Sequence, residues 1–493
     1  GDYMSIKYLY DRKRIAVTYG EQKISYADVI KYVNYYSGFL DITKGDRSAL
    51  MMENRPESIF SFFSIWAKKG IAMSLDAGYT VDQLAYVLGD STPKYLFVSN
   101  KTKKVAEEAN SKLNNIIKII NVDELVLPAE YKIKKEEFEN DSNDDVAVIV
   151  YTSGTTGNPK GVMITYENIK TNMEGVRAVD LVNETDVILA MLPYHHIMPL
   201  CFTLILPMCM GVPIVLLTEI SSASLLKTLQ ENRVTVILGV PRVWEMLDKA
   251  IMIKINESSL AKFMFKMAEK INSMAIRKML FSKVHKQFGG HIRLMVSGGA
   301  KIDKNILEDF RTMGFCAIQG YGMTETAPII AFNVPGRERS DSAGEVIPNV
   351  EVKIADDGEI LVKGKNVMKG YYNNEKATEK AFDKDGWFHT GDLGRMDGKY
   401  LIIIGRKKEM IVLPNGKNID PNDIENEIIK NTDLIKEIAI TEYKEQLLAI
   451  IYPDFQQIEA KKILNIKDAI KWEVIDKYNV TAPNYKKIHD IKI

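Results

Sequence analysis

The chain alternates between short apolar runs rich in Val and Ile and longer segments whose apolar positions recur every three to four residues. The first pattern is typical of buried strands and the second of amphipathic helices. The predicted strands are 145–152, 235–240, 292–299 and 315–322, and the predicted helices are 166–179, 224–233 and 304–314. This alternation predicts an α/β fold with doubly wound parallel sheets, which bind ligands at the carboxyl ends of their strands.

After about residue 343 the pattern changes. "VEVKIADDGEILVKG" predicts a hairpin with a Gly turn, and "GKYLIIIGR" predicts another strand, which together indicate a small β-barrel-like section. Beyond Gly405–Arg406, two strands over 435–455 and a helix over 468–479 indicate a compact α+β tail. We therefore expect a large N-terminal domain over 1–406 and a small C-terminal domain over 407–493.

The uncharged segment 199–217 is nearly long enough to span a bilayer. It contains Pro207, Gly211 and Pro213, which interrupt helices. These residues favour a buried helix, a turn at 210–211 and a buried strand over a membrane span.

Charge and cysteine content narrow the function classes. Lys and Arg total 65, as do Asp and Glu, so the bulk charge indicates neither a nucleic-acid partner nor a membrane partner. Cys201, Cys209 and Cys316 lack the spacing of a metal site, and three cysteines fit a reducing compartment. We expect a cytoplasmic protein without a nucleic-acid partner.

The stretch "YTSGTTGNPKGVMIT" (151–165) follows a predicted buried strand. It lacks the Gly-Lys-Ser/Thr end of the NTPase P-loop. Its glycines still let backbone N–H groups face an anion, its hydroxyls add donors, and Lys160 adds a positive charge. From the residues alone, a phosphate-binding loop and a solvated turn remain alternatives.

Four motifs in order carry a family resemblance. The loop resembles the signature of the adenylate-forming (AMP-binding) superfamily, which includes acyl-CoA synthetases, luciferases and peptide-synthetase adenylation domains. "GYGMTET" (320–326), "GWFHTGDLG" (386–394) and "GRKKEMIVLPNGKNIDPNDIE" (405–425) resemble its later motifs. "VPRVWEMLDKAI" (240–251) looks most like the long-chain fatty acyl-CoA synthetase branch.

The resemblance implies an ATP-dependent long-chain fatty acid–CoA ligase. Such an enzyme converts a carboxylate and ATP to acyl-AMP and pyrophosphate, and then forms a thioester with CoA. ATP, Mg²⁺ and CoA would be its cosubstrates and cofactor. A ligase for an acyl carrier protein, a ligase for medium-chain or aryl acids, and a nucleotide-binding pseudoenzyme are the alternatives.

The resemblance also implies roles at the phosphates. Thr324 would contact the α-phosphate, and Glu325 would help hold Mg²⁺, a cation that prefers oxygen ligands. The residues expected to cradle the leaving phosphates are Thr152, Ser153, Gly154, Thr155, Thr156, Gly157 and Lys160.

For the nucleoside, the resemblance implies that Tyr321 stacks on adenine, while Asp392 and Arg406 bind the ribose hydroxyls. The expected neighbours of the nucleotide are the backbone of Gly298, Gly299 and Ala300 and the motif residues Gly320, Gly322 and Met323.

Three further residues take roles from the resemblance. His196 in "LPYHHIM" would border the acyl site and gate it. General-base catalysis is not expected of it, because a carboxylate substrate is already ionised at neutral pH. Lys408 would be the hinge about which a mobile small domain rotates between the two half-reactions. Gly416 would line the channel for the pantetheine thiol, with a plain Asn-Gly turn as the alternative.

Residues 251–293 are rich in Met, Phe and Lys, and they are strongly basic in an otherwise neutral chain. One interpretation is a helical surface that makes a peripheral contact with the inner face of an anionic membrane. The other is a set of helices with solvated lysines and a stripe facing the core.

Family members end in a further motif with a lysine that contacts the carboxylate and the α-phosphate. This sequence stops at "APNYKKIHDIKI", which resembles the segment just before that motif, and Lys486 and Lys487 match a different segment. Truncation and genuine absence both remain open. From the residues given, we expect ATP binding and thioester formation from acyl-adenylate, but slow adenylation.

Overall fold

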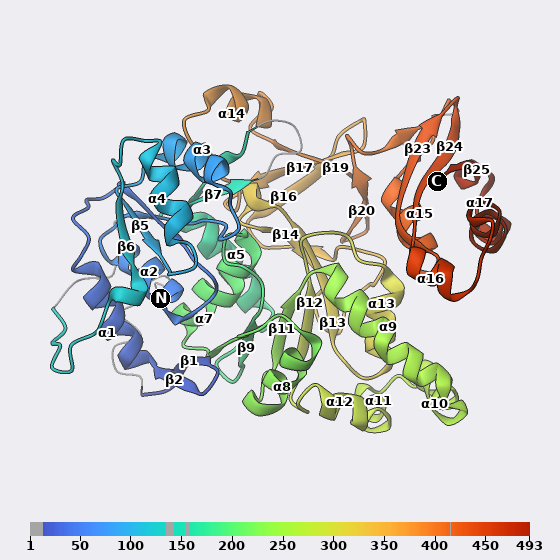
Figure 1. Cartoon of the computed structure of the whole chain (residues 1–493), viewed down its shortest axis with the longest axis horizontal. Helices are drawn as coiled ribbons and strands as arrows, with labels where there is room; N and C mark the ends of the chain where they lie inside the picture. Colours follow the sequence, from blue (N-terminus) through green and yellow to red (C-terminus); the bar gives the residue numbers. More distant parts are fainter. Residues whose placement is uncertain (1–12, 135–141, 153–157, 415) are drawn as a thin grey trace. The chain divides into compact units, whose positions relative to one another are not determined.

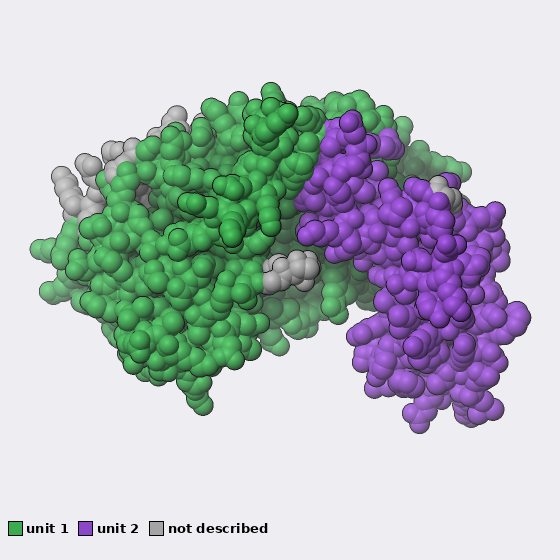
Figure 2. Space-filling view, turned by 90° about the horizontal axis from the view of Figure 1, so that it is seen from above, with its two compact units in different colours: residues 1–353, 361–389, 396–402 green, residues 354–360, 390–395, 403–493 purple. Residues whose placement is uncertain are grey.

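The computed structural model describes residues 13–134, 142–152, 158–414 and 416–493, and every structural statement below concerns these residues. The chain divides into two compact units (Figure 2). The larger unit comprises 1–353, 361–389 and 396–402, and the smaller comprises 354–360, 390–395 and 403–493. The predicted α/β fold with a large and a small part is confirmed. The predicted domain boundary between 406 and 407 stays a prediction.

The first sheet of the larger unit has seven strands within the described residues (Figure 1). Its order is β18 (Gly370–Tyr371), β8 (Lys160–Thr165), β7 (Val146–Thr152), β4 (Ile71–Ser74), β3 (Arg47–Met51), β5 (Tyr95–Val98) and β6 (Lys118–Asn121). The strands from β7 to β6 are parallel, whereas β8 and β18 are antiparallel additions.

The second sheet of this unit carries the other predicted strands. From β15 onward its order is β15 (Glu345–Val346), β14 (Ile329–Phe332), β13 (Ala317–Gly322), β12 (Leu294–Ser297), β11 (Val236–Gly239), β9 (Ile188–Ala190), β10 (Ile214–Leu216), β1 (Ile15–Tyr19) and β2 (Gln22–Ser25). All neighbours from β13 to β1 are parallel. The sequence predicted parallel sheets here, and the strand positions agree to within about two residues.

Helices flank the strands, and the predicted helices form. The helices of the larger unit are α1 (Tyr26–Ser37), α2 (Pro56–Ala67), α3 (Val81–Ser91), α4 (Lys103–Ser111), η2 (Val122–Glu124), α5 (Tyr166–Ala178), α8 (Ser222–Asn232), α9 (Pro241–Glu257), α10 (Ser259–Glu269), α11 (Met274–Leu280), α12 (Ser282–Gln287), α13 (Lys304–Thr312), η4 (Thr324–Thr326) and α14 (Glu375–Ala381). Every residue of α2 except Glu57 is buried, because the helix is otherwise apolar or small on all sides.

The apolar segment 199–217 is buried inside the larger unit. It forms α6 (Ile197–Leu200), η3 (Cys201–Ile205), α7 (Leu206–Met210) and β10, with Gly211 in a left-handed conformation at φ +73°. The predicted helix, turn and strand are therefore confirmed. No helix in the described part of the chain is long and apolar enough to cross a membrane.

The remaining strands lie in the part of the chain after residue 343, where the sequence pattern changes. Four of them, β16 (Val350–Ile354), β17 (Glu359–Gly364), β19 (Phe388–Asp397) and β20 (Tyr400–Arg406), are neighbours in this order. The smaller unit adds β21 (Ile411–Val412), β22 (Asn418–Ile419), β23 (Ile435–Tyr443), β24 (Gln446–Pro453) and β25 (Ile488–Lys492). Its helices are α15 (Pro421–Lys430), α16 (Phe455–Ala460), α17 (Ile466–Ile470), η5 (Lys471–Ile475), α18 (Asp476–Thr481) and η6 (Asn484–Lys486), around a core of their own.

Candidate functional site

The predicted phosphate loop lies between β7 and β8. Thr152, the last residue of β7, is the cross-strand partner of Lys160, the first residue of β8. The sequence pattern predicted α5 as the next element after the loop, whereas the structure places β8 before it. Five predicted site residues lie outside the described residues: Ser153, Gly154, Thr155, Thr156 and Gly157.

Lys160 and Glu325 meet through a tyrosine that the sequence reasoning missed. The Tyr371 hydroxyl donates a hydrogen bond to Glu325 Oε2 at 3.2 Å, and Lys160 Nζ lies 5.0 Å from the centre of the Tyr371 ring. Tyr371 reaches this position because β18 pairs with β8, with Tyr371 opposite Val162. The structure thus brings the predicted lysine and carboxylate to one tyrosine ring.

The electrostatics of Tyr371 suit a hydrogen-bond donor. Burial raises the pKa of its hydroxyl strongly, and the Glu325 carboxylate raises this pKa further. The hydroxyl therefore stays protonated and keeps donating to Glu325 at neutral pH. A sequence signal existed in "GYY" at 370–372, where an aromatic pair follows a glycine.

Thr324 and Glu325 lie on a short 3₁₀ turn, η4, which a helix residue holds in place. Asn172, in the middle of α5, is fully buried, and its amide donates to the Thr326 carbonyl at 3.3 Å. Its carbonyl oxygen accepts from the Ile329 N–H at 2.7 Å. The backbone carbonyl of Glu325 also accepts from the Met368 N–H at 2.8 Å. Asparagine is unfavourable inside helices, so its presence in the predicted helix was a usable signal.

The glycine turns after β12 and β13 lie at the same edge of the sheet. The two strands are parallel, with Ser297 opposite Gln319, so both chains leave the sheet at this edge. The predicted nucleotide neighbours at these strand ends are Gly298, Gly299, Ala300, Gly320, Tyr321, Gly322 and Met323. The structure therefore gathers them at the edge where such sheets bind ligands.

The histidine motif adjoins one of these turns. His196 is the N-cap residue of α6 and is exposed. Two residues on, Met198 packs on Gly298 so closely that a Cβ there would lie 2.2 Å from the methionine sulfur. This places the start of α6, with its predicted gate His196, against the turn predicted to face the nucleotide.

The two histidines are poor proton acceptors. The rings of His195 and His196 lie 4.1 Å apart, and Asp76 Oδ2 lies 3.6 Å from His195 Nε2. Burial and His196 lower the pKa of His195 to about 4, against the opposing effect of Asp76. Neighbouring atoms cover part of the His196 ring and lower its pKa as well, although the residue as a whole is exposed. Both rings are therefore neutral at physiological pH.

This pKa shift predicts a pH-dependent stability. Between pH 6.5 and about 4, unfolded His195 binds a proton that the folded residue does not bind. The free energy of unfolding should therefore fall as the pH drops through this window. In the His195→Gln variant the fall should be shallower, as measured by urea denaturation across the window. The exposed His291→Gln variant is the control, and an equal change in both variants would contradict the assignment.

Two predicted ribose ligands pair within the smaller unit. Asp392, on β19, is 8% exposed, and its Oδ1 lies 3.5 Å from Nε of Arg406 at the end of β20. The Arg406 side chain is 55% exposed. The pair therefore presents an anchored carboxylate and an accessible guanidinium.

Lys408 and Gly416 lie on the segments that follow β20. Lys408 is exposed, two residues after the strand ends. Gly416 has φ +80° in the turn between β21 and β22, where its N–H donates to the Leu413 carbonyl at 2.8 Å. The conformation explains the glycine as a turn residue. Its predicted place in a thiol channel stays a prediction.

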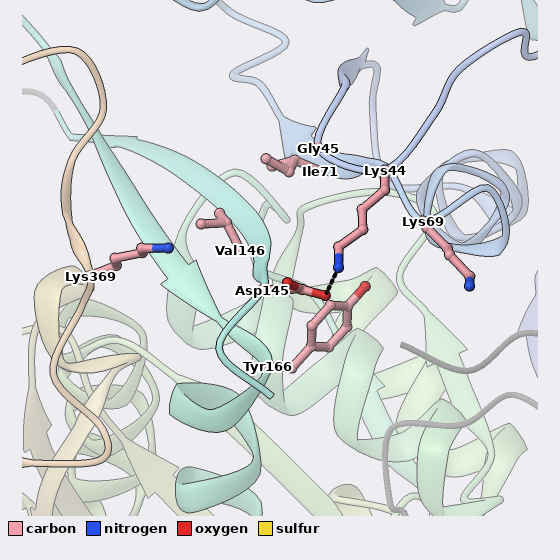
Figure 3. A pocket seen from close by; sticks show the side chains of 8 residues that line it. All are labelled: Lys44, Gly45, Lys69, Ile71, Asp145, Val146, Tyr166 and Lys369. Carbon is pink, nitrogen blue, oxygen red and sulfur yellow. Dashed lines mark ion pairs between the residues drawn. The ribbon is translucent and has the colours of Figure 1, made fainter. Parts of the chain in front are cut away.

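A cavity of about 150 Å³ lies elsewhere in the larger unit (Figure 3). Its lining includes Lys44, Lys69, Lys369, Asp145 and Tyr166, and Lys44 Nζ forms an ion pair with Asp145 Oδ2 at 3.1 Å. None of the predicted site residues lines this cavity. It is therefore separate from the arrangement around Tyr371.

No group of three or more His, Cys, Asp or Glu residues that could hold a metal occurs in the part of the chain that the structure describes. A Mg²⁺ ion bound together with ATP would take most of its ligands from phosphates and water and one or two from carboxylates. Glu325 is a suitable single carboxylate, because Tyr371 orients it and its backbone is fixed on both sides of the turn.

Comparisons with known proteins agree with this geometry. The family model described as AMP-binding enzyme matches residues 10–372, and the model for the AMP-binding enzyme C-terminal domain matches 408–493. A long-chain-fatty-acid–CoA ligase of Mycobacterium bovis is 28% identical over 466 residues, covering 87% of this chain and 76% of the relative. A 2-succinylbenzoate–CoA ligase of Bacillus subtilis is 29% identical over 435 residues, covering 85% of this chain and 80% of the relative.

A solved structure shares the whole fold. The O-succinylbenzoate coenzyme A synthetase of Bacillus subtilis in complex with ATP and a magnesium ion superposes with a TM-score of 0.77. It is 25% identical, and the match covers 99% of this chain and 95% of that one. Since one family model spans most of the chain and another its end, the chain belongs to the adenylate-forming AMP-binding enzyme family.

Proposed function

We propose that the chain is an ATP-dependent acid–CoA ligase that forms an acyl-adenylate and transfers its acyl group to CoA. The arrangement of Lys160, Tyr371 and Glu325 at the β7–β8 hairpin carries this proposal. It places a cation and an oriented carboxylate beside the predicted phosphate loop. The names of the relatives, which are acid–CoA ligases for several acids, support it.

Adenylation brings a carboxylate anion onto a polyanion, so the site must neutralise negative charge. Lys160 supplies a positive charge to the leaving phosphates, and Thr324 binds the α-phosphate. Glu325 would hold Mg²⁺, which when bound would neutralise charge on the phosphates. Tyr371 keeps the Glu325 carboxylate oriented and separates it from the Lys160 ammonium.

The remaining predicted residues bind the rest of ATP and CoA. Tyr321 and the turns after β12 and β13 bind adenine, while Asp392 and Arg406 bind the ribose hydroxyls. We propose two domains, 1–406 and 407–493, with Lys408 as the hinge between the half-reactions. Gly416 borders the pantetheine thiol.

For the acyl group we propose a long-chain fatty acid. The resemblance of 240–251, which forms the first part of α9, supports this choice, as does the mycobacterial relative. Each methylene buried in an apolar tunnel contributes about 0.8 kcal/mol, so a long chain would gain roughly 10 kcal/mol over acetate. An apolar tunnel would therefore select strongly for length.

A panel of acids tests the substrate. Thioester formation would be measured with palmitate, octanoate and 2-succinylbenzoate, with CoA and an acyl carrier protein as competing acceptors. We expect palmitoyl-CoA to form fastest. Faster turnover of 2-succinylbenzoate would contradict the proposed fatty acid substrate, but it would still support the proposed acid–CoA ligase reaction. ATP binding without any thioester would indicate a pseudoenzyme instead.

The Tyr371→Phe variant tests the hydrogen bond between the Tyr371 hydroxyl and Glu325. Loss of one hydrogen bond to a charged group costs about 1.5–3 kcal/mol in binding or orientation, so the Mg²⁺ concentration for half-maximal pyrophosphate release should rise about tenfold or more. The neighbouring Tyr372→Phe is the matched control, because Tyr372 contacts Arg47 rather than Glu325. An unchanged Mg²⁺ requirement in Tyr371→Phe would mean that the hydrogen bond from Tyr371 to Glu325 has no functional role.

A further inference from the structure

The helices α9, α10 and α11 lie together at the lower edge of the larger unit in Figure 1, and α10 packs against α9, α11 and α13. The inner face of α10 is buried, with Phe265 and Ala268 in the core and Ala261 and Met264 packed against it. The core-facing stripe of one interpretation of the sequence is therefore present. It uses only one face of the helix.

The outer face of α10 carries a second apolar stripe. Leu260, Phe263 and Met267 are 68%, 60% and 45% exposed. Their spacing of three and then four residues places them on one face of the helix. Large exposed side chains are normally scattered singly, whereas an apolar stripe on one helix face indicates a binding surface. The flanking helices add exposed apolar residues: Met246 and Ile253 on α9, and Met274, Ile276 and Met279 on α11.

Lysines border this stripe. Lys262 and Lys266 lie on α10, Lys270 caps it, and all three are exposed. No carboxylate among the described residues lies within 4.0 Å of these three ammonium groups. Residues 251–293 hold seven lysines and two arginines against two glutamates, whereas the whole chain has a formal net charge of zero. The surface is therefore apolar along its middle and positively charged at its margin.

We propose that α10, with α9 and α11 beside it, docks this protein on the surface of an anionic lipid bilayer. A helix with Leu, Phe and Met on one face and Lys at its edges suits the boundary between head groups and acyl chains. If two copies of this surface faced each other, their lysines would lie close together and repel, which disfavours self-association. The apolar stripe distinguishes the surface from nucleic-acid interfaces, which are more polar.

Vesicle flotation with the full chain tests this proposal. We expect binding to vesicles that contain phosphatidylglycerol, weak binding to phosphatidylcholine alone, and a decrease as salt rises. The triple variant Lys262→Glu/Lys266→Glu/Lys270→Glu should lose binding by at least about tenfold. The triple variant Leu260→Ser/Phe263→Ser/Met267→Ser should lose a similar amount, because it removes the inserted apolar groups.

Two controls keep the test specific. Lys376→Glu/Lys380→Glu on α14 changes exposed lysines elsewhere, and Val480→Ser removes an exposed apolar side chain; both should bind like the unsubstituted chain. Circular dichroism checks that each variant folds. Unchanged flotation of both α10 variants would overturn the proposal. So would a dimer that the serine variant dissociates, because the stripe would then be a contact between copies. Flotation needs neither ATP nor acid, so a failure of the proposed ligase activity leaves this test unaffected.

Discussion

The Glu325→Gln variant should slow acid-dependent pyrophosphate release by about 100-fold or more relative to the unsubstituted chain, the loss typical of removing one charge-stabilising group. Glutamine matches the size of glutamate and can still accept the Tyr371 hydrogen bond. Only the negative charge is removed, so the loss would measure the role of Glu325 in holding Mg²⁺. The binding of ATP should become insensitive to Mg²⁺, as measured by titration with and without the ion.

The matched control is Glu375→Gln, an exposed glutamate at the start of α14. It should keep the rate and the Mg²⁺ dependence of the unsubstituted chain. Equal activity of the Glu325 variant and this control would show that Glu325 does not hold Mg²⁺. The role that we propose for Tyr371, which is to orient Glu325, would then fail as well.

The Gly322→Ala variant should be severely destabilised, by about 3 kcal/mol or more, as expected for overpacking against fixed backbone. A Cβ at Gly322 would lie 1.7 Å from the Pro328 carbonyl oxygen. This oxygen cannot move away cheaply, because it accepts hydrogen bonds from the Met323 N–H and the Thr326 hydroxyl. The thermal unfolding midpoint, or the yield of folded protein, would report the effect.

Gly320→Ala provides a control in the same strand and motif. Its Cβ would meet the Phe332 Cβ at 3.6 Å, an ordinary contact, so the unfolding midpoint should stay close to that of the unsubstituted chain. Similar unfolding midpoints for the two alanine variants would show that the backbone around Pro328 shifts to make room for the new Cβ, despite its hydrogen bonds.

The sequence predicted the strands and helices well where their pattern was local and strong. β7, β13 and α5 were placed to within about two residues, because buried parallel strands are continuous apolar runs and α5 has helical periodicity. β8 was missed because "KGVMIT" directly follows a loop signal. Its antiparallel pairing with β7 cannot be predicted from any local pattern.

The site was only partly predictable for the same reason. Lys160 and Glu325 came from motifs, but Tyr371 and Asn172 act through contacts with residues far away in the sequence. For 251–293 the sequence left two interpretations open, a membrane-facing surface and a core-facing stripe, since apolar residues on two faces of one helix blur its periodicity. In each case the missing information was the packing of distant segments.

The most direct test of the proposed chemistry follows an oxygen atom. The chain would be supplied with ATP, Mg²⁺, CoA and an accepted acid whose carboxylate carries heavy oxygen. The carboxylate oxygen bonds to the α-phosphorus as pyrophosphate leaves, and attack of the CoA thiol then breaks the bond between the acyl carbon and that oxygen. The account predicts AMP that carries one heavy oxygen, formed in an amount equal to the acyl-CoA. ADP as the product, or AMP without the label, would contradict it.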